Sequence, residues 1–221
     1  MGYRIRVWDL PTRIFHWALV LCIVGLVITG EIGGEVMPWH FRLGYAVLSL
    51  LLFRLVWGFI GGRWSRFASF VRAPATVLAY VRARGQVEPS VGHNPLGAGS
   101  VLAMLFFLLA QVASGSLSDD EIANSGPLAK FVSNATVSLA SKYHSEIGKV
   151  ILIVLVLLHL AAIVFYRMRK KENLVPAMLH GDKEFLQPMD PSRDDLRSRA
   201  LAAVVFSLCA ALVAWGVQLA G

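Results

Sequence analysis

Charge is scarce in this sequence, and several long stretches contain almost none. Only 16% of the residues are Asp, Glu, Lys or Arg, whereas 56% are hydrophobic and the mean hydropathy is +0.61. Soluble domains have about 25% charged residues. A chain this poor in charge and this rich in apolar residues is expected to be an all-α integral membrane protein.

Basic residues are nearly absent from some segments between the apolar runs and concentrated in others. The N-terminal segment, residues 61–97 and residues 167–199 hold three, five and eight Lys or Arg. This alternation accounts for the net charge of +7 through the positive-inside rule and argues against a nucleic-acid partner. It predicts five membrane crossings, with a cytoplasmic N-terminus and an external C-terminus.

The apolar runs are long enough to cross a bilayer, which takes about 20 residues per helix. The first run lacks an A-x-A cleavage site, so we expect a helix of the mature protein rather than a signal peptide. Five transmembrane helices are predicted, at about Thr12–Gly30, Pro38–Ile60, Ala98–Leu117, Lys142–Arg167 and Ala200–Leu219. Phe67–Ala83 is expected to form an amphipathic helix along the membrane surface, and part of Pro127–Leu139 a short helix.

Two histidines on the run Lys142–Arg167 suggest a function. His144 and His159 are fifteen residues apart. On a helix they lie roughly 22 Å apart along the axis and only about 60° apart around it. An imidazole in a membrane helix either hydrogen-bonds a neighbouring backbone carbonyl or marks a functional site. Two on one face, near opposite membrane surfaces, suggest axial ligands for two stacked cofactors.

Two other helices supply histidines at matching depths. The predicted topology pairs His40 with His144 on the external side and His16 with His159 on the internal side. Each pair offers two imidazoles, as a six-coordinate haem iron requires. Structural zinc is the rival, but it prefers four protein ligands. No C-x-x-C-H motif is present, so two non-covalent b haems are expected.

Three further residues accompany the histidines. Gly44 and Gly148 each follow a predicted ligand by four residues, where a flat macrocycle could approach the backbone. Arg54 lies fourteen residues after His40, deep in an apolar run. Its buried guanidinium needs an anion such as a haem propionate, unless the side chain extends to the interface.

The remaining histidines lie outside the apolar runs. His93, in the sequence His93-Asn94-Pro95, marks a turn before the next helix; it is either structural or a hydrogen-bond donor to a propionate. His180 lies in a polar stretch and is expected to bind no metal. The run Ala98–Leu117 contains no histidine, so it is expected to be scaffold.

Four segments together resemble the bacterial cytochrome b561 family: RVWDLPTRIFHW, RLVWGFIG, GHNPLG and the central run with its two histidines. That family includes the b-type subunit of nickel-iron hydrogenases and superoxide-oxidising di-haem cytochromes. The resemblance covers about residues 3–180 and implies a four-helix core with two b haems that exchanges electrons with membrane quinone. Four residues fall on the family's ligand positions: His16, His40, His144 and His159. The fifth helix departs from the pattern.

The expected function is transmembrane electron transfer between the quinone pool and a periplasmic redox partner, such as a cytochrome c or a hydrogenase. We expect residues 1–180 to form the di-haem domain and residues 181–221 a basic linker and last helix. The small residues of that helix suit packing against a neighbouring helix or a second copy. Two alternatives remain: superoxide oxidation at the external haem, and a membrane anchor that holds haem without redox turnover.

The external connections suggest which end meets which partner. They carry acidic residues, including Glu31, Glu35 and Asp119, which suit a cationic protein better than superoxide. Quinone is therefore expected at the internal haem, close to Phe67–Ala83, and the protein partner at the external haem.

Overall fold

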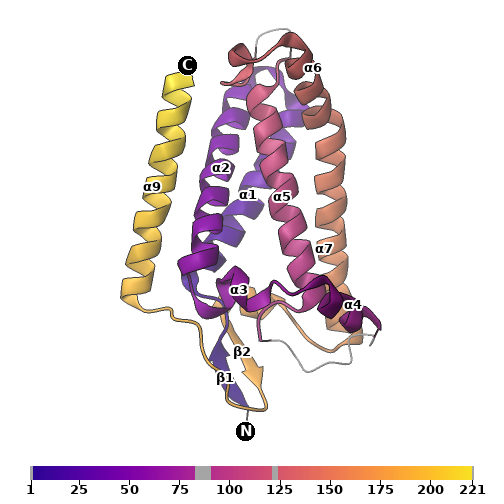
Figure 1. The fold of residues 1–221 in the computed structure, drawn as a ribbon, viewed down its shortest axis with the longest axis vertical. Coiled ribbons are helices and arrows are strands. Elements are labelled where there is room, and N and C mark those ends of the chain that lie inside the picture. The colour runs from indigo at the N-terminus through magenta and orange to yellow at the C-terminus, as the bar shows by residue number, and fades with distance from the viewer. Residues whose placement is uncertain (1, 83–90, 121–123, 221) are drawn as a thin grey trace. The chain divides into compact units, whose positions relative to one another are not determined.

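The computed structural model describes residues 2–82, 91–120 and 124–220. In this part of the chain, five helical segments are long and apolar enough to cross a membrane, as predicted. Their main helices, labelled in Figure 1, are α1 (Leu10–Ile32), α2 (Met37–Ile60), α5 (Pro95–Leu117), α7 (Lys149–Arg169) and α9 (Leu196–Ala220). Four of them begin one to four residues before the predicted position, a difference within the usual uncertainty of helix ends.

The described chain forms two compact units, each assembled from segments far apart in sequence. The first comprises Met1–His16, Arg54–Ala103 and His159–Val205; the second comprises Trp17–Phe53, Met104–Leu158 and Phe206–Gly221. His16 and His159 therefore fall in the first unit, and His40 and His144 in the second. Both predicted histidine pairs are internal to one unit.

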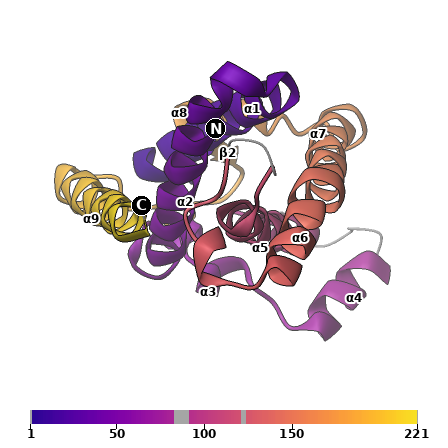
Figure 2. The same ribbon diagram turned by 90° about the horizontal axis from the view of Figure 1, so that it is seen from above.

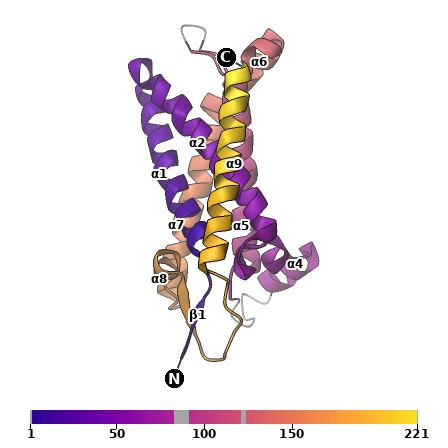
Figure 3. The same cartoon turned by 90° about the vertical axis from the view of Figure 1, so that its left-hand side faces the viewer.

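The first unit contains a small sheet that the sequence analysis did not predict. Strand β1 (Tyr3–Arg6) pairs antiparallel with β2 (Asp182–Phe185), with Tyr3 opposite Phe185 and Arg6 opposite Asp182. Helix α8 (Val175–His180) precedes β2 and packs beside it (Figure 3). The strands are too short to show an alternating pattern, and their pairing depends on residues nearly a chain length apart.

A buried carboxylate links the start of α1 to the segment that follows it in the first unit. Asp9 is fully buried, and its Oδ1 accepts hydrogen bonds from the Thr12 N–H at 2.8 Å and the Trp57 indole at 3.2 Å. Its Oδ2 accepts a bond from the Ser65 hydroxyl at 2.7 Å. Such a network satisfies the buried charge and caps α1. Trp57 is therefore held by Asp9 rather than free to line a pocket.

The predicted surface helix Phe67–Ala83 is two helices. Helix α3 (Phe67–Phe70) ends before Pro74, which begins α4 (Pro74–Arg82). Proline disfavours helical geometry in the residue before it and is well tolerated in a first turn, so the break occurs at this point. Ala83 lies outside the described residues.

In the second unit the central helix begins earlier than predicted and contains an irregular turn. Helix α6 (Asn134–Lys142) starts after Ser133, whose hydroxyl accepts a hydrogen bond from the Thr136 N–H at 3.3 Å. A π-helical turn, η4 (Tyr143–Gly148), then joins α6 to α7. Figure 2 shows the two helices, α6 and α7. Single π-turns inside helices frequently occur at functional sites, and this one contains His144.

The last helix has a neighbour within the second unit. Phe206 of α9 and Phe53 of α2 pack edge to face, with ring centres 6.1 Å apart. Cys209, Val213 and Ala220 are buried and occupy one face of α9. The sequence analysis expected α9 to pack closely on another helix, and in this unit that helix is α2.

Candidate functional site

His40 and His144 face each other in the second unit. Their ring centres are 6.0 Å apart and the ring planes are inclined by 85°. His40 lies near the start of α2 and His144 in the π-turn η4. The structure thus brings together the pair predicted for the external side.

The Nδ1 atom of His40 is held by the C-terminal half of α1. It lies 3.2 Å from the Leu26 carbonyl oxygen and 3.2 Å from the Thr29 hydroxyl. That hydroxyl donates its own hydrogen to the Gly25 carbonyl at 2.7 Å, so it is available to His40 as an acceptor. Both contacts therefore require His40 to donate from Nδ1.

The Nδ1 atom of His144 is held in the same way by α5. It lies 2.9 Å from the Gln111 carbonyl oxygen, which can only accept. In return the Gln111 side-chain amide donates to the His144 carbonyl oxygen at 2.8 Å. Two hydrogen bonds thus join the same two residues, one through each side chain.

These contacts fix the tautomer of both rings. A neutral imidazole that donates from Nδ1 carries its lone pair on Nε2, and metal-binding histidines are usually oriented in this way. Two such nitrogens, each about 2 Å from one metal, put the ring centres roughly 6 Å apart. The 6.0 Å observed between His40 and His144 fits one six-coordinate iron between them.

Glycines shape the space around these rings. A β-carbon on Gly115 of α5 would lie 2.6 Å from Cε1 of His144, and one on Gly30 of α1 would lie 3.3 Å from Cε1 of His40. The two predicted glycines differ. Gly44 faces open space, whereas a β-carbon on Gly148 would collide with the Gln111 side chain. Space for a macrocycle was predicted beside both glycines, but it is found only beside Gly44.

His16 and His159 come together in the first unit. His16 lies in the second turn of α1 and His159 in α7, and His16 lies within electrostatic range of His159. Both side chains are half-buried. The two histidines predicted as the internal pair therefore belong to one compact unit.

Arg54 lies in the same unit and is buried. Only 3% of its surface is exposed, and its guanidinium carbon lies 4.9 Å above the centre of the Phe67 ring. Within the described residues, its Nη1 is buried without a hydrogen-bond partner. The side chain does not extend into solvent. A buried guanidinium with an unused donor suits an anionic group that binds there.

His93 is enclosed by aromatic rings. It packs against Trp8 and Phe70, with ring centres 4.7 Å away in each case, and its Nδ1 has no hydrogen-bond partner among the described residues. Burial, together with the nearby Arg54 and His159, lowers the pKa of His93 to about 3. The imidazole is therefore neutral at physiological pH and can still donate one hydrogen bond.

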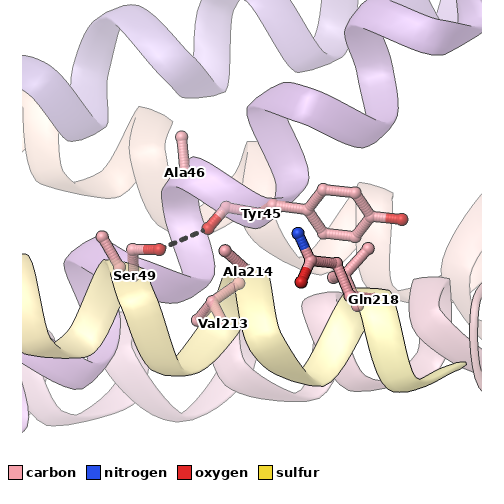
Figure 4. A pocket seen from close by; sticks show the side chains of 8 residues that line it. Tyr45, Ala46, Ser49, Val213, Ala214 and Gln218 are labelled. Carbon is pink, nitrogen blue, oxygen red and sulfur yellow. Dashed lines mark hydrogen bonds between the residues drawn. The ribbon is translucent and has the colours of Figure 1, made fainter.

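A shallow groove between α2 and α9 lies away from the histidines. It has a volume of about 340 Å³ and is lined by small and apolar side chains of both helices, with Tyr45, Ser49 and Gln218 as its polar members (Figure 4). The Ser49 hydroxyl is used within α2, where it donates to the Tyr45 carbonyl at 2.9 Å. The groove contains none of the predicted ligands.

The described residues contain no group of three or more His, Cys, Asp or Glu that could hold a metal ion. Paired imidazoles such as those of His40 and His144 suit a haem better than a tetrahedral zinc site. Four residues around these rings were not predicted from the sequence: Leu26, Thr29 and Gln111, which contact them, and Gly115, which leaves room for His144. Gln111 was the one detectable signal, because it is a lone amide in an otherwise apolar run.

A family profile matches most of this chain. The profile of prokaryotic cytochrome b561 matches residues 7–181. Similar proteins include the "Probable Ni/Fe-hydrogenase 1 B-type cytochrome subunit" of Escherichia coli strain K12, 24% identical over 135 residues, or 49% of this chain and 57% of that protein. Another is the "Probable Ni/Fe-hydrogenase B-type cytochrome subunit" of Bradyrhizobium diazoefficiens, 25% identical over 214 residues, or 82% of this chain and 86% of that protein.

The match to the Escherichia coli protein spans little more than half of its length. No solved structure matches this chain significantly. The profile match, however, includes all four paired histidines and most of the sequence. This protein belongs to the prokaryotic cytochrome b561 family.

Proposed function

We propose that this protein is a transmembrane electron-transfer cytochrome with two b haems. One would be held by His40 and His144 and the other by His16 and His159. The observation that carries the proposal is the external pair, whose imidazoles lie 6.0 Å apart while both Nδ1 atoms donate to neighbouring oxygens. Family membership supports the choice of haem b.

The chain would hold each haem through a different set of contacts. At the external site, the helix carbonyls of Leu26 and Gln111 orient the two imidazoles, and Gly44 leaves room for the macrocycle. At the internal site, the unused donors of Arg54 and His93 suit the propionates. Charge-assisted hydrogen bonds from arginine to carboxylates are among the stronger polar contacts in proteins.

Haem supplies reversible one-electron chemistry at its iron. The protein supplies axial ligands, orientation and an apolar surrounding. With two histidines as its protein ligands, a haem at either site would have no iron position open for a substrate. This arrangement favours electron transfer over oxygen binding. His144 would serve one site and His159 the other; the first lies in the π-turn η4 and the second in α7.

The partners follow from the family and from the charge pattern. Similar proteins are named hydrogenase B-type cytochrome subunits, so a hydrogenase, or a cytochrome c, would exchange electrons at the His40–His144 end. Glu35 and Asp120 are exposed in that unit and suit a cationic surface. Quinone would react near the His16–His159 site, beside α3 and α4.

The same reasoning gives a domain assignment and an orientation. Residues 1–180 would form the di-haem domain, and residues 181–221 the linker and the additional helix α9. The basic segments would face the cytoplasm of a bacterium, with the acidic end in the periplasm.

Quinol reduction tests this proposal. The purified protein in detergent should show a b-type reduced spectrum within seconds of mixing with a ubiquinol or menaquinol analogue, and His16→Ala should slow this reduction. His180→Ala serves as the control, since that residue is exposed at the end of α8, outside the five long apolar helices. A protein that binds haem but is never reduced by quinol, while dithionite reduces it fully, would be a haem-holding anchor instead.

A further inference from the structure

We propose that Gln111 is the positioning residue of the external site, which clamps His144 and its π-turn and so sets the orientation of that axial imidazole. The inference rests on the proposed role of His144 as a haem ligand. Gln111 belongs to α5, the helix that the sequence analysis regarded as scaffold because it lacks histidine.

The first observation is a reciprocal pair of hydrogen bonds. His144 donates from Nδ1 to the Gln111 carbonyl at 2.9 Å, and Gln111 donates from Nε2 to the His144 carbonyl at 2.8 Å. One bond fixes the ring and the other fixes the backbone from which the ring projects. An imidazole held at both points cannot rotate about its side-chain bonds without breaking one contact.

The second observation is the irregular helix at this point. His144 lies in the π-turn Tyr143–Gly148, between α6 and α7. A π-turn has poorer internal hydrogen bonding than an α-helix, and it is retained where something outside the helix stabilises it. The Gln111 amide supplies such a contact, because it reaches the carbonyl of the second residue of the turn.

The third observation concerns space. A β-carbon on Gly148 would collide with Oε1 of Gln111 and lie 2.8 Å from Cε1 of Tyr143, so the absence of a side chain there admits the glutamine. A β-carbon on Gly115, one turn after Gln111, would lie 2.6 Å from Cε1 of His144. Both glycines are explained by the clamp.

Removal of the Gln111 side-chain amide should affect the external site in a specific way. The bond that keeps His144 Nδ1 protonated goes to the Gln111 backbone carbonyl, so it survives any substitution of the side chain. Removing the side-chain amide therefore keeps the tautomer and releases the π-turn. The expected change is a reoriented axial ring at the external haem, with the internal haem unaffected.

The test compares two substitutions in the full-length protein. Gln111→Met keeps the length of the side chain but cannot donate to the His144 carbonyl, whereas Gln111→Glu can donate when protonated, as burial favours. The measurements are the low-spin electron paramagnetic resonance signals of the oxidised protein, the midpoint potential of each haem, and the haem content. Gln218→Met in α9 is the matched control.

We expect Gln111→Met to shift the signal and the potential of one haem only, and Gln111→Glu to restore both toward wild type. Loss of one haem in Gln111→Met with recovery in Gln111→Glu would support the same role. Unchanged signals in Gln111→Met, equal shifts of both haems, or loss of haem in both variants would overturn the inference. His144→Ala distinguishes a wrong ligand assignment from a wrong role for Gln111. If the His144→Ala protein keeps both haems, His144 is not a haem ligand.

Discussion

Asp194 accepts a hydrogen bond from the backbone N–H of Leu10 at 3.1 Å, although 184 residues separate the two in the chain. The same carboxylate pairs with Arg6 at 2.9 Å and with Arg199 at 3.0 Å. It therefore caps the start of α1 and ties β1 to the start of α9. Burial alone would raise the pKa of Asp194, but the bonds from Arg199 and Leu10 and the charges of Arg199 and Arg6 lower it overall.

Asp194→Asn should lower the stability of the protein by about 1–3 kcal/mol, the usual cost of losing hydrogen bonds to a largely buried charge. Thermal unfolding in detergent at pH 7 measures this. Asp190→Asn is the control, because Asp190 and Arg63 form an exposed pair that should contribute roughly 0–1 kcal/mol. Equal losses in the two variants would contradict the anchoring role of Asp194.

The pH dependence of the same site has a defined sign. A carboxyl group with a lowered pKa in the folded state stabilises the protein fully above its ordinary pKa of about 3.9, and this contribution is lost as the pH falls through the folded-state pKa. The stability difference between wild type and Asp194→Asn should therefore be constant above about pH 5 and shrink in more acidic solution. A difference that grew on acidification would show that Asp194 is not the titrating group.

The close approach of α5 to His144 can be tested with glycine. Gly115→Ala should displace the imidazole and reduce the content of one haem, at a cost of about 1–3 kcal/mol for overpacking. Gly99→Ala, on the same helix, is the matched control because its β-carbon would meet nothing within 4 Å. Equal haem content in the two variants would mean that Gly115 does not border the haem ligand.

Arg54 supplies a prediction for the internal site. Arg54→Met removes the charge that would face a propionate, so one haem should transfer faster to apomyoglobin. Arg54→Lys keeps the charge, so its haem should transfer at a rate close to that of the wild type. The absorbance of the transferred haem gives the rate. If the Met and Lys variants both release haem at the wild-type rate, Arg54 has another role.

The side of the membrane that serves quinone can be tested on α4. Leu78 is 48% exposed on this helix. Leu78→Gln should slow the reduction of the haems by quinol without changing their spectra, because the substitution alters the apolar surface and not the ligands. If Leu78→Gln leaves the rate of haem reduction by quinol unchanged, while substitutions beside His40 slow it, quinone reacts at the His40–His144 site instead.

Much of this fold follows from local properties of the sequence. Length and hydropathy predict the five apolar helices because the requirement for apolar residues acts on each segment separately. The histidine pairs were predictable because imidazoles are rare in such segments. Leu26 was not, since its backbone carbonyl leaves no trace in the sequence and acts only once its helix has a neighbour.

Two other features required tertiary information. The sheet of β1 and β2 joins short strands from opposite ends of the chain, so neither strand is recognisable alone. The π-turn that contains His144 has an ordinary helical sequence, and it depends on a contact from α5. The role of Gly148 also required tertiary information. Its position four residues after His144 suggested space for a cofactor, whereas in the structure it makes room for the Gln111 side chain.

The central claim is that two pairs of histidines each hold one haem. It is tested most directly by the ratio of haem b to polypeptide, measured by pyridine haemochrome absorbance on the purified protein. The account predicts two haems in the wild type, one in His144→Ala, one in His16→Ala and none in the double variant. A ratio of one in the wild type, or of two in either single variant, would contradict it.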